Sequence, residues 1–370
     1  MSIIITVITW ILGLVCLVFM VLSLLAGHYV SSGLAMIMAI VLIPVLRNWF
    51  WEYSGIKLPV WLQIVIVPVC LFFFMFFIFN TMGNKYSIYE NDQIEEKLNN
   101  IYNSHLALWG LDFQTRFIKT QYGIVHVIAS GKEDLPPLIL LHASSMSSWP
   151  WVYNVEELNQ HYRTYAIDTI GDAGRSKLSK MEVYPNTGEK LAVLYKEIMD
   201  SLGVEKASFI GASQGGYIAT NIALYAQERV DKIVLCGPMG YTGTFRSVMR
   251  IIFTTMFPLK AIQENATRWA FGDNPHVLAE VSEWFRTILT GVISRQARPK
   301  SFSDEQLQSL KMPVLLLLGN NDGLTGNPQK ALKRVEKLPN FQTRVLETGH
   351  LISAEKPEMF NHLVLKFLGE

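Results

Sequence analysis

A serine lies between small residues near the middle of the chain, in a pattern that could expose and activate its hydroxyl group. The segment Gly211–Gly215 reads Gly-Ala-Ser-Gln-Gly and so matches the motif G-x-S-x-G. An apolar run, Ala207–Ile210, precedes it and a helical pattern follows, which predicts the sharp strand-to-helix turn called a nucleophile elbow. Gly211 and Gly215 suit this turn because it brings backbone segments close together. The hydroxyl of Ser213 is therefore a candidate nucleophile, provided that a base lies beside it.

A carboxylate and a histidine follow two later strands in matching positions. Asp322 comes after the apolar run Val314–Leu318, and His350 comes after the run Thr343–Leu346. Serine, then acid, then histidine is the chain order expected with such an elbow. Both side chains would stand just beyond the carboxyl end of a strand, where open α/β sheets place their sites. We therefore predict Ser213 as nucleophile, His350 as its base and Asp322 as the residue that orients the base.

The other carboxylates and histidines fit these roles less well. Asp231 precedes its strand and lies at the wrong end of the sheet, whereas Asp168 ends an earlier strand but has no matching base. Three histidines fall within or beside predicted strands or helices, which favours structural or surface positions: His126, His161 and His362. His276 could touch a substrate, although a surface position is favoured.

Acyl transfer also needs hydrogen-bond donors aimed at the oxyanion that forms during the reaction. The backbone N–H of Gln214, directly after the nucleophile, is expected to be one donor. The second should come from the loop after an early strand, here His142–Ser145, and we assign it to the N–H of Ser144. An ordinary turn is the alternative interpretation of this serine-rich loop.

The elements that must position these residues alternate between strand and helix. Phe113–Ile128 has the pattern of a β-hairpin. Short apolar runs then predict strands at Leu138–Leu141, Tyr165–Ile167, Ala207–Ile210, Lys232–Leu235, Val314–Leu318 and Thr343–Leu346. Helical patterns occur at Leu191–Leu202, Gln214–Gln227 and Ala354–Leu368. This order predicts an α/β fold, a mainly parallel sheet flanked by helices, formed by residues 113–240 and 303–370.

One segment, residues 241–302, interrupts the alternation. It is mainly helical in pattern, rich in aromatic residues and methionine, and without an evident strand. We interpret it as an inserted helical lid. For most of its large apolar side chains, such as Trp269, Trp284 and Phe285, the favoured explanation is the lid's own core rather than contact with a substrate.

The N-terminal part, residues 1–83, differs sharply in composition. No Lys, Arg, Asp or Glu occurs from Met1 to Leu46. A bilayer span takes roughly 20 residues of helix. The apolar stretches Ile3–Ala26, Tyr29–Leu46 and Val60–Met82 therefore predict an anchor of two or three transmembrane helices. A cleaved signal peptide fits poorly, because no basic residue precedes the first stretch and further apolar stretches follow.

Charged residues bear on the orientation of this anchor. Arg47 and Lys57 lie in the second connection and favour a cytoplasmic position for it, which would put the domain that follows outside. Lys85 and Lys97 oppose this orientation, and the side changes if the middle stretch does not span. Within residues 84–112, apolar residues recur at helical spacing, which predicts an amphipathic helix that links anchor and domain.

Composition excludes several classes of function. Beyond the anchor, acidic and basic residues are balanced and form no basic run, which argues against a nucleic-acid partner. The cysteines Cys16, Cys70 and Cys236 form neither a CxxC motif nor a metal-type spacing, so a disulfide framework and a cysteine zinc site are both unsupported. The sequence implies no metal and no organic cofactor.

From about Trp109 to Glu370 the chain resembles the α/β-hydrolase superfamily, and most of all its small bacterial carboxylesterase-type members. The resemblance rests on motifs in the family's order: Leu140–Ala143, Asp168–Ser176, Gly211–Gly215, Leu318–Asp322 and Gly349 with His350. It departs at Ala143, where the family commonly has glycine. Epoxide hydrolases and haloalkane dehalogenases of this fold use aspartate as nucleophile, so Ser213 separates the chain from them.

The triad and the resemblance together imply hydrolysis of a carboxylic ester through an acyl-enzyme. The apolar lid and anchor favour a hydrophobic or lipid-derived ester, and a multi-pass location in a bacterial cell membrane with the lipid bilayer as a partner. Thioester hydrolysis, C–C bond cleavage, perhydrolysis and peptide hydrolysis use the same groups and remain alternatives. A non-catalytic membrane-bound ligand sensor is the alternative of another class, and it would have no activated nucleophile.

Overall fold

The computed structural model describes residues 10, 13–14, 16–17, 29–43, 46, 48, 52, 87–110, 112–242, 260–272 and 274–369. By its internal contacts the chain divides into two compact units, Met1–Gly83 and Asn84–Glu370. The first contains helix α2, and the second contains the sheet with its flanking helices.

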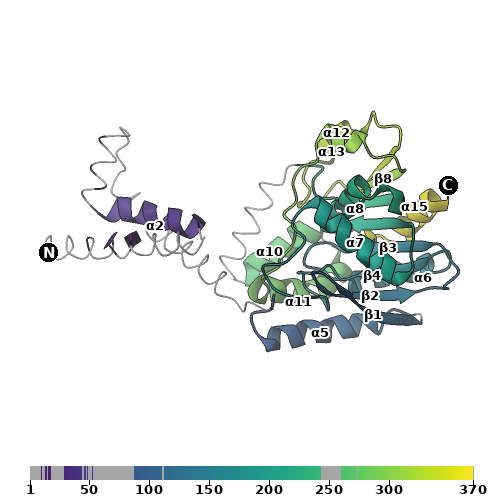
Figure 1. Cartoon of the computed structure of the whole chain (residues 1–370), viewed down its shortest axis with the longest axis horizontal. Coiled ribbons are helices and arrows are strands. Elements are labelled where there is room, and N and C mark those ends of the chain that lie inside the picture. The colour runs from purple at the N-terminus through teal and green to yellow at the C-terminus, as the bar shows by residue number, and fades with distance from the viewer. Residues whose placement is uncertain are drawn as a thin grey trace. The chain divides into compact units, whose positions relative to one another are not determined.

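The described part of the first unit is mainly helix α2, Tyr29–Leu42, which lies in the middle apolar stretch (Figure 1). It has 14 residues, whereas a bilayer span takes roughly 20. Among the described residues, no helix is both long enough and apolar enough to cross a membrane. Most of the stretch Ile3–Ala26 and all of Val60–Met82 lie outside the described residues, so the number of spans stays a prediction.

Within the described residues of the second unit, a nine-stranded sheet forms the centre (Figure 1). Its strands are β1 (Phe113–Thr120), β2 (Gly123–Ser130), β3 (Pro137–Leu141), β4 (Arg163–Ile167), β5 (Lys177–Leu178), β6 (Ala207–Ala212), β7 (Val230–Cys236), β8 (Val314–Gly319) and β9 (Phe341–Leu346). Their order along the sheet is β1-β2-β4-β3-β6-β7-β8-β9, and β5 pairs with β2. Strands β1 and β2 form the predicted antiparallel hairpin, and β2 is also antiparallel to β4. The strands from β4 to β9 on this path are parallel, which confirms the predicted sheet.

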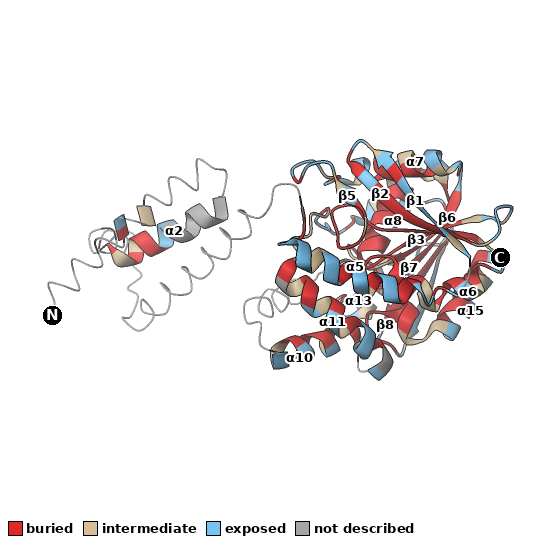
Figure 2. Cartoon of the chain, turned by 90° about the horizontal axis from the view of Figure 1, so that it is seen from below, coloured by how far each residue is buried: buried red, intermediate tan, exposed pale blue. Residues whose placement is uncertain are grey.

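Helices cover both faces of the sheet, because neighbouring residues of a strand point to opposite sides. In β3, Ile139 and Leu141 join one core, whereas Leu138 and Leu140 join the other. The first core packs against α7 (Gly188–Leu202), α8 (Gln214–Tyr225) and α13 (Pro328–Val335). The second packs against α5 (Asp92–Leu106), α6 (Val155–Leu158) and α15 (Pro357–Gly369). Figure 2 shows the central strands β3, β6 and β7 buried between these layers, whereas β1 at the edge of the sheet is partly exposed.

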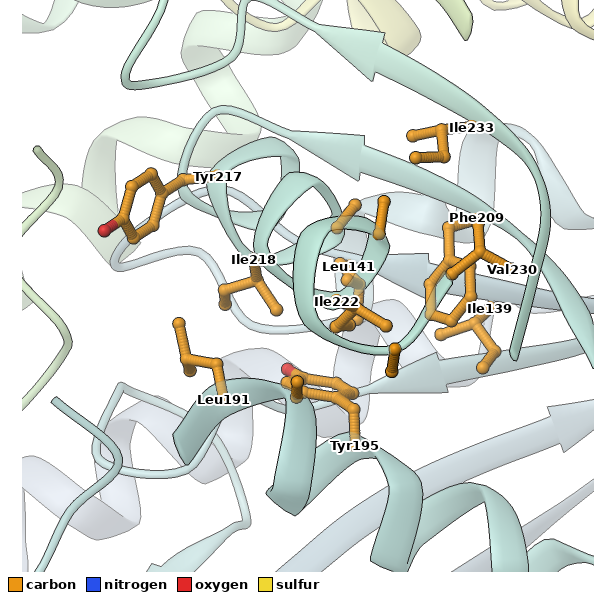
Figure 3. Packing of buried hydrophobic residues seen from close by; sticks show 14 of the residues in the cluster. Ile139, Leu141, Leu191, Tyr195, Phe209, Tyr217, Ile218, Ile222, Val230 and Ile233 are labelled. Atoms are coloured by element: carbon orange, nitrogen blue, oxygen red, sulfur yellow. The ribbon is translucent and has the colours of Figure 1, made fainter. Parts of the chain in front are cut away.

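The first core illustrates how sequence periodicity becomes packing. Leu191 and Tyr195 lie on one side of α7 and face Ile222 of α8 (Figure 3). Helix α7 begins after Thr187, whose hydroxyl accepts a hydrogen bond from the N–H of Lys190. Short elements complete the unit: η1 (Trp149–Tyr153), η2 (Gln227–Arg229), α12 (Asp304–Gln308) and α14 (Ile352–Glu355).

Helix α5 lies within residues 84–112, where the sequence predicts an amphipathic helix. It begins after Asn91, whose side chain accepts a hydrogen bond from the N–H of Ile94. It buries Leu98, Tyr102 and Leu106 against the second core, so its apolar face belongs to the second unit.

The predicted lid contains two helices in its described part, α10 (Lys260–Phe271) and α11 (Pro275–Gly291). Residues 243–259 and the side chain of His276 lie outside the description. The expectation that the aromatic residues form the lid's own core holds only in part. Phe271 and Phe285 do contact each other, with ring centroids 5.0 Å apart. Trp284 instead packs against Trp149 of the main domain, because α11 lies on the second core.

Candidate active site

The candidate residues lie at the carboxyl ends of the parallel strands. Strand β3 has β4 on one side and β6 on the other. The chain therefore builds the sheet outward from β3 first in one direction and then in the other. Open α/β sheets place their ligands at such a switch point. Leu141 at the end of β3 is in register with Gly211 in β6. The loops that carry Ser144 and Ser213 therefore begin side by side.

Ser213 occupies a sharp turn between β6 and α8 in a strained backbone conformation. Its φ is 51° and its ψ is −109°, a combination that few residues other than glycine adopt. A Cβ at Gly211 would lie 2.5 Å from the carbonyl oxygen of Gly215, and a Cβ at Gly215 would overlap the carbonyl oxygen of Leu141. This crowding is the physical reason for both glycines of the motif.

The turn after β7 connects the elbow to the predicted acid and base. The N–H of Ser213 donates to the carbonyl oxygen of Cys236 over 2.8 Å. The next residue is Gly237, where a Cβ would lie 3.0 Å from Oδ2 of Asp322 and 3.3 Å from Nδ1 of His350. Cys236 thus contacts the backbone of Ser213, and the adjacent Gly237 contacts the carboxylate–imidazole pair.

Asp322 and His350 form a buried hydrogen-bonded pair. Nδ1 of His350 donates to Oδ2 of Asp322 over 2.8 Å, from loops that follow the neighbouring strands β8 and β9. Because Nδ1 carries the proton, Nε2 is left as an acceptor, which is the tautomer that a general base needs. Ser213, Asp322 and His350 are 2%, 5% and 4% exposed.

The surroundings of Asp322 keep it ionised. Its Oδ1 accepts the N–H groups of Leu324 and Thr325 over 2.8 and 2.9 Å, and its Oδ2 also accepts the Thr325 hydroxyl. Burial by itself raises the pKa of Asp322, but the charge of His350 and the hydrogen bonds from His350 and Thr325 outweigh burial and lower the pKa below its usual range. Sequence reasoning missed Thr325. The one signal was a threonine three residues after an aspartate, a spacing that also occurs in ordinary turns.

The loop after β3 contains two residues in the left-handed region. Ser145 has a φ of 65° and Ser147 a φ of 58°, and with Ser213 they are the non-glycine residues of positive φ in the described chain. Such conformations persist where the surroundings enforce them, and they gather at functional sites. Ala143 does not share this conformation. A methyl group therefore fits where the resembled family commonly has glycine.

Both predicted oxyanion donors have available N–H groups. The turn from Ala143 is closed by the N–H of Met146, which donates to the Ala143 carbonyl oxygen over 3.1 Å. Among the described residues, none accepts a hydrogen bond from the N–H of Ser144. Gln214 is the first residue of α8, where backbone N–H groups have no partner within the helix.

Comparison with known proteins decides the family. A family profile described as alpha/beta hydrolase fold matches residues 136–283. Carboxylesterase YbfK of Bacillus subtilis (strain 168) is 34% identical over 284 residues, which cover 72% of this chain and 92% of that protein. The chain belongs to the α/β-hydrolase family. It is an enzyme, a serine hydrolase similar to carboxylesterases.

Solved structures agree with this assignment of the hydrolase. The crystal structure of carboxylesterase CesB (YbfK) from Bacillus subtilis matches with a TM-score of 0.69 at 30% identity, over 75% of this chain and 98% of that one. The naproxen esterase (carboxylesterase NP) from Bacillus subtilis matches with a TM-score of 0.68 at 30% identity, over 73% of this chain and 96% of that one.

A second carboxylate–histidine pair lies in the core of this α/β-hydrolase, and it corrects the expectation that Asp168 has no matching base. Nδ1 of His126 in β2 donates to Oδ2 of Asp168 over 3.0 Å, and both side chains are fully buried. The Tyr102 hydroxyl of α5 donates to Oδ1 over 3.2 Å. Burial raises the pKa of Asp168, but the hydrogen bond and charge of His126 outweigh burial and lower the pKa to about 2. The pair joins α5 to the sheet, in keeping with the structural position favoured for His126.

The hydrolase also has a carboxylate beside the candidate base that sequence reasoning did not single out. Oε2 of Glu355 accepts the N–H of Gly349 over 2.9 Å, directly before His350. Burial is the main reason that the pKa of Glu355 is raised above its usual value. A Cβ at Gly272 would lie 3.0 Å from Oε2 of Glu355. The end of helix α10 therefore contacts the loop that carries His350.

Proposed function

We propose that this α/β-hydrolase cleaves carboxylic esters with Ser213 as nucleophile, His350 as general base and Asp322 as the residue that orients the base. The observation that carries the proposal is the buried hydrogen bond from Nδ1 of His350 to Asp322, at the sheet edge that also holds the strained serine. The likeness to carboxylesterases supports an ester as the substrate.

In the proposed reaction, Nε2 of His350 takes the hydroxyl proton of Ser213, and Oγ attacks the ester carbonyl carbon. The N–H groups of Gln214 and Ser144 stabilise the oxyanion. Protonated His350 gives its proton to the departing alcohol and leaves an acyl-enzyme. The same imidazole then activates a water that releases the carboxylic acid. Asp322 stays ionised at neutral pH because its pKa is lowered, and it stabilises the imidazolium.

Labelling with a fluorophosphonate probe, using the full-length protein in membranes, tests the nucleophile. We expect the wild type to be labelled, and Ser213→Ala and His350→Ala to lose labelling, because neither variant retains an activated serine. Ser208→Ala is the matched control, since Ser208 is a buried serine on the same strand β6, and it should label like the wild type. A folded wild type that does not react would contradict the proposal and favour the non-catalytic ligand sensor.

The proposed substrate is a hydrophobic or lipid-derived ester. The apolar composition of the N-terminal unit and the aromatic residues of the lid support it. A series of p-nitrophenyl esters of increasing acyl length measures this preference, and we expect kcat/KM to rise from acetate to longer chains. Activity confined to acetate would rule out the hydrophobic substrate and leave the triad proposal intact.

We also propose that residues 1–83 attach the enzyme to a bacterial cell membrane by two or three spans, with the catalytic unit on the outer side. The apolar stretches support the attachment, and Arg47 with Lys57 supports the side. Protease added outside intact cells should digest the catalytic unit. Protection of this unit until the cells are broken would place it on the inner side.

A further inference from the structure

The loop that carries Ser144 is fixed by groups from outside itself. The N–H of Ser145 donates to Oδ2 of Asp172 over 2.7 Å. The carbonyl oxygen of Ser145 accepts the indole N–H of Trp284 over 2.6 Å. Asp172 follows β4 and Trp284 lies on lid helix α11, so two distant segments hold a single residue of left-handed conformation from both sides.

These two hydrogen bonds bear on the direction of the neighbouring N–H of Ser144. That N–H shares a planar trans peptide with the carbonyl of Ala143, so the two groups point in opposite directions. The Ala143 carbonyl oxygen accepts Nδ1–H of His142 over 2.7 Å and the N–H of Met146 over 3.1 Å. The turn is thus fixed at Ala143 on one side and at Ser145 on the other, with the Ser144 N–H between them.

Trp284 differs from two other buried tryptophans in the hydrogen bonding of its indole N–H. Trp149, Trp151 and Trp284 are all buried in the second core. The indole nitrogens of Trp149 and Trp151 have no hydrogen-bond partner among the described residues, whereas that of Trp284 reaches the oxyanion loop. Packing therefore accounts for the first two rings, while the third also carries a directed donor.

We infer that Trp284 is a positioning residue for the ester hydrolysis proposed above: its indole N–H holds the Ser145 carbonyl and thereby aims the Ser144 N–H at the oxyanion. The inference rests on the proposed function. Trp284 itself touches no reacting atom. Helix α11 then contributes to the chemistry by fixing a backbone donor.

Helix α11 is itself held in place, so Trp284 can act as a fixed donor. Glu280 accepts a hydrogen bond from Nε2 of His105 over 2.6 Å, and Glu283 pairs with Lys97 over 3.2 Å, both partners being on α5. The end of α11 is bound through the N–H of Glu90, which donates to the Gly291 carbonyl over 2.9 Å. Oxyanion stabilisation depends on donors that do not reorganise during the reaction, and this support meets that requirement.

The effect of losing the indole N–H should fall on the transition state. Removing an oxyanion donor outright costs roughly 10²- to 10³-fold in kcat. Trp284→Phe would misdirect such a donor rather than remove it, so we expect kcat to fall by about tenfold. Because substrate binding does not use the oxyanion contact fully, KM should stay within about twofold of the wild type.

The test compares full-length wild type, Trp284→Phe and Trp151→Phe on a p-nitrophenyl ester, with a trifluoromethyl ketone as an inhibitor whose adduct needs the oxyanion donors. For Trp284→Phe we expect kcat to fall and inhibitor binding to weaken by the same factor, at unchanged KM. Trp151→Phe, which removes an indole N–H without a described partner, should match the wild type in all three values.

Wild-type kcat and inhibition in folded Trp284→Phe would overturn the inference. So would equal losses in the two variants, because these would mark a general effect on packing. If Trp284→Phe fails to fold, the benzothienyl analogue of tryptophan is placed at position 284, because it removes only the N–H. The same kinetic and inhibitor measurements on that protein then test the inference. An inactive wild type would instead refute the proposed function, so the two failures are distinguishable.

Discussion

Two of the hydrogen bonds that the carboxylate of Asp322 accepts come from one residue, Thr325. Its N–H reaches Oδ1 and its hydroxyl reaches Oδ2, the oxygen that also accepts from His350. The threonine therefore fixes the carboxylate plane and contributes to the lowered pKa of Asp322. Such a group affects catalysis through the acid, without contact to the reacting atoms.

Thr325→Val should lower kcat by about tenfold with little change in KM, because a hydrogen bond to a charged group is worth roughly 1.5–3 kcal/mol and part of it is retained through the backbone N–H. Steady-state kinetics on a p-nitrophenyl ester measure both values. Thr267→Val is the matched control, since among the described residues that buried hydroxyl bonds only the Gln263 carbonyl within α10. A wild-type kcat in Thr325→Val would show that Asp322 needs no such support.

The triad candidates could be predicted from sequence because each follows an apolar strand directly, so the signal is local. Thr325 and Glu355 could not. Their roles come from contacts that the fold creates, and serine, threonine and glutamate near a loop are common without such roles. The structure brings the acid and the base together and sets Ser213 at the neighbouring turn, as the strand order implies. The roles of the three residues await the labelling experiment.

At the scale of elements, helix α5 is joined to the sheet by a buried polar cluster. Asp168 of the β4 loop accepts from His126 of β2 and from Tyr102 of α5. Sequence could not indicate this pairing. Strand β3 lies between β2 and β4 in the chain, yet β2 and β4 are neighbours in the sheet.

The Asp168 cluster predicts a dependence of stability on acid. Because the pKa of folded Asp168 is lowered to about 2, its contribution is complete above the unfolded value near 4 and is lost as pH falls toward 2. Asp168→Asn should cost roughly 3–5 kcal/mol in the free energy of unfolding at pH 7. Its stability should also vary less than that of the wild type between about pH 4 and 2.

Urea unfolding across this pH range measures both effects. Asp200→Asn provides the comparison, because Asp200 pairs with Arg229 at the surface and such pairs are worth at most about 1 kcal/mol. Parallel pH profiles of wild type and Asp168→Asn would show that the cluster does not couple protonation to folding.

At the scale of the whole molecule, the Bacillus subtilis carboxylesterases match part of the chain. YbfK is covered over 92% of its own length by 72% of this chain. The second unit has its own cores on both faces of its sheet. Composition alone indicated the boundary near residue 83, because charged residues become frequent only beyond it. The arrangement of the apolar stretches could not be derived in the same way, since hydropathy gives length but not the packing of one helix on another.

Removal of residues 1–83 should leave a folded hydrolase with kcat/KM on a short soluble ester within about twofold of the full chain, because the site lies wholly in the second unit. After cell fractionation and a carbonate wash, the full chain should stay with the membranes and the shortened chain should be soluble. Release of the full chain by the wash would contradict the anchor, and aggregation of the shortened chain would contradict its independence.

The left-handed conformation of Ser213 has a consequence for how this enzyme can evolve. A non-glycine residue in such a conformation costs of order 1–3 kcal/mol, and glycine would relieve it. Selection for stability alone would thus favour glycine in place of Ser213, the proposed nucleophile. A serine at this crowded turn therefore lowers stability, and the rest of the fold has to supply what is lost.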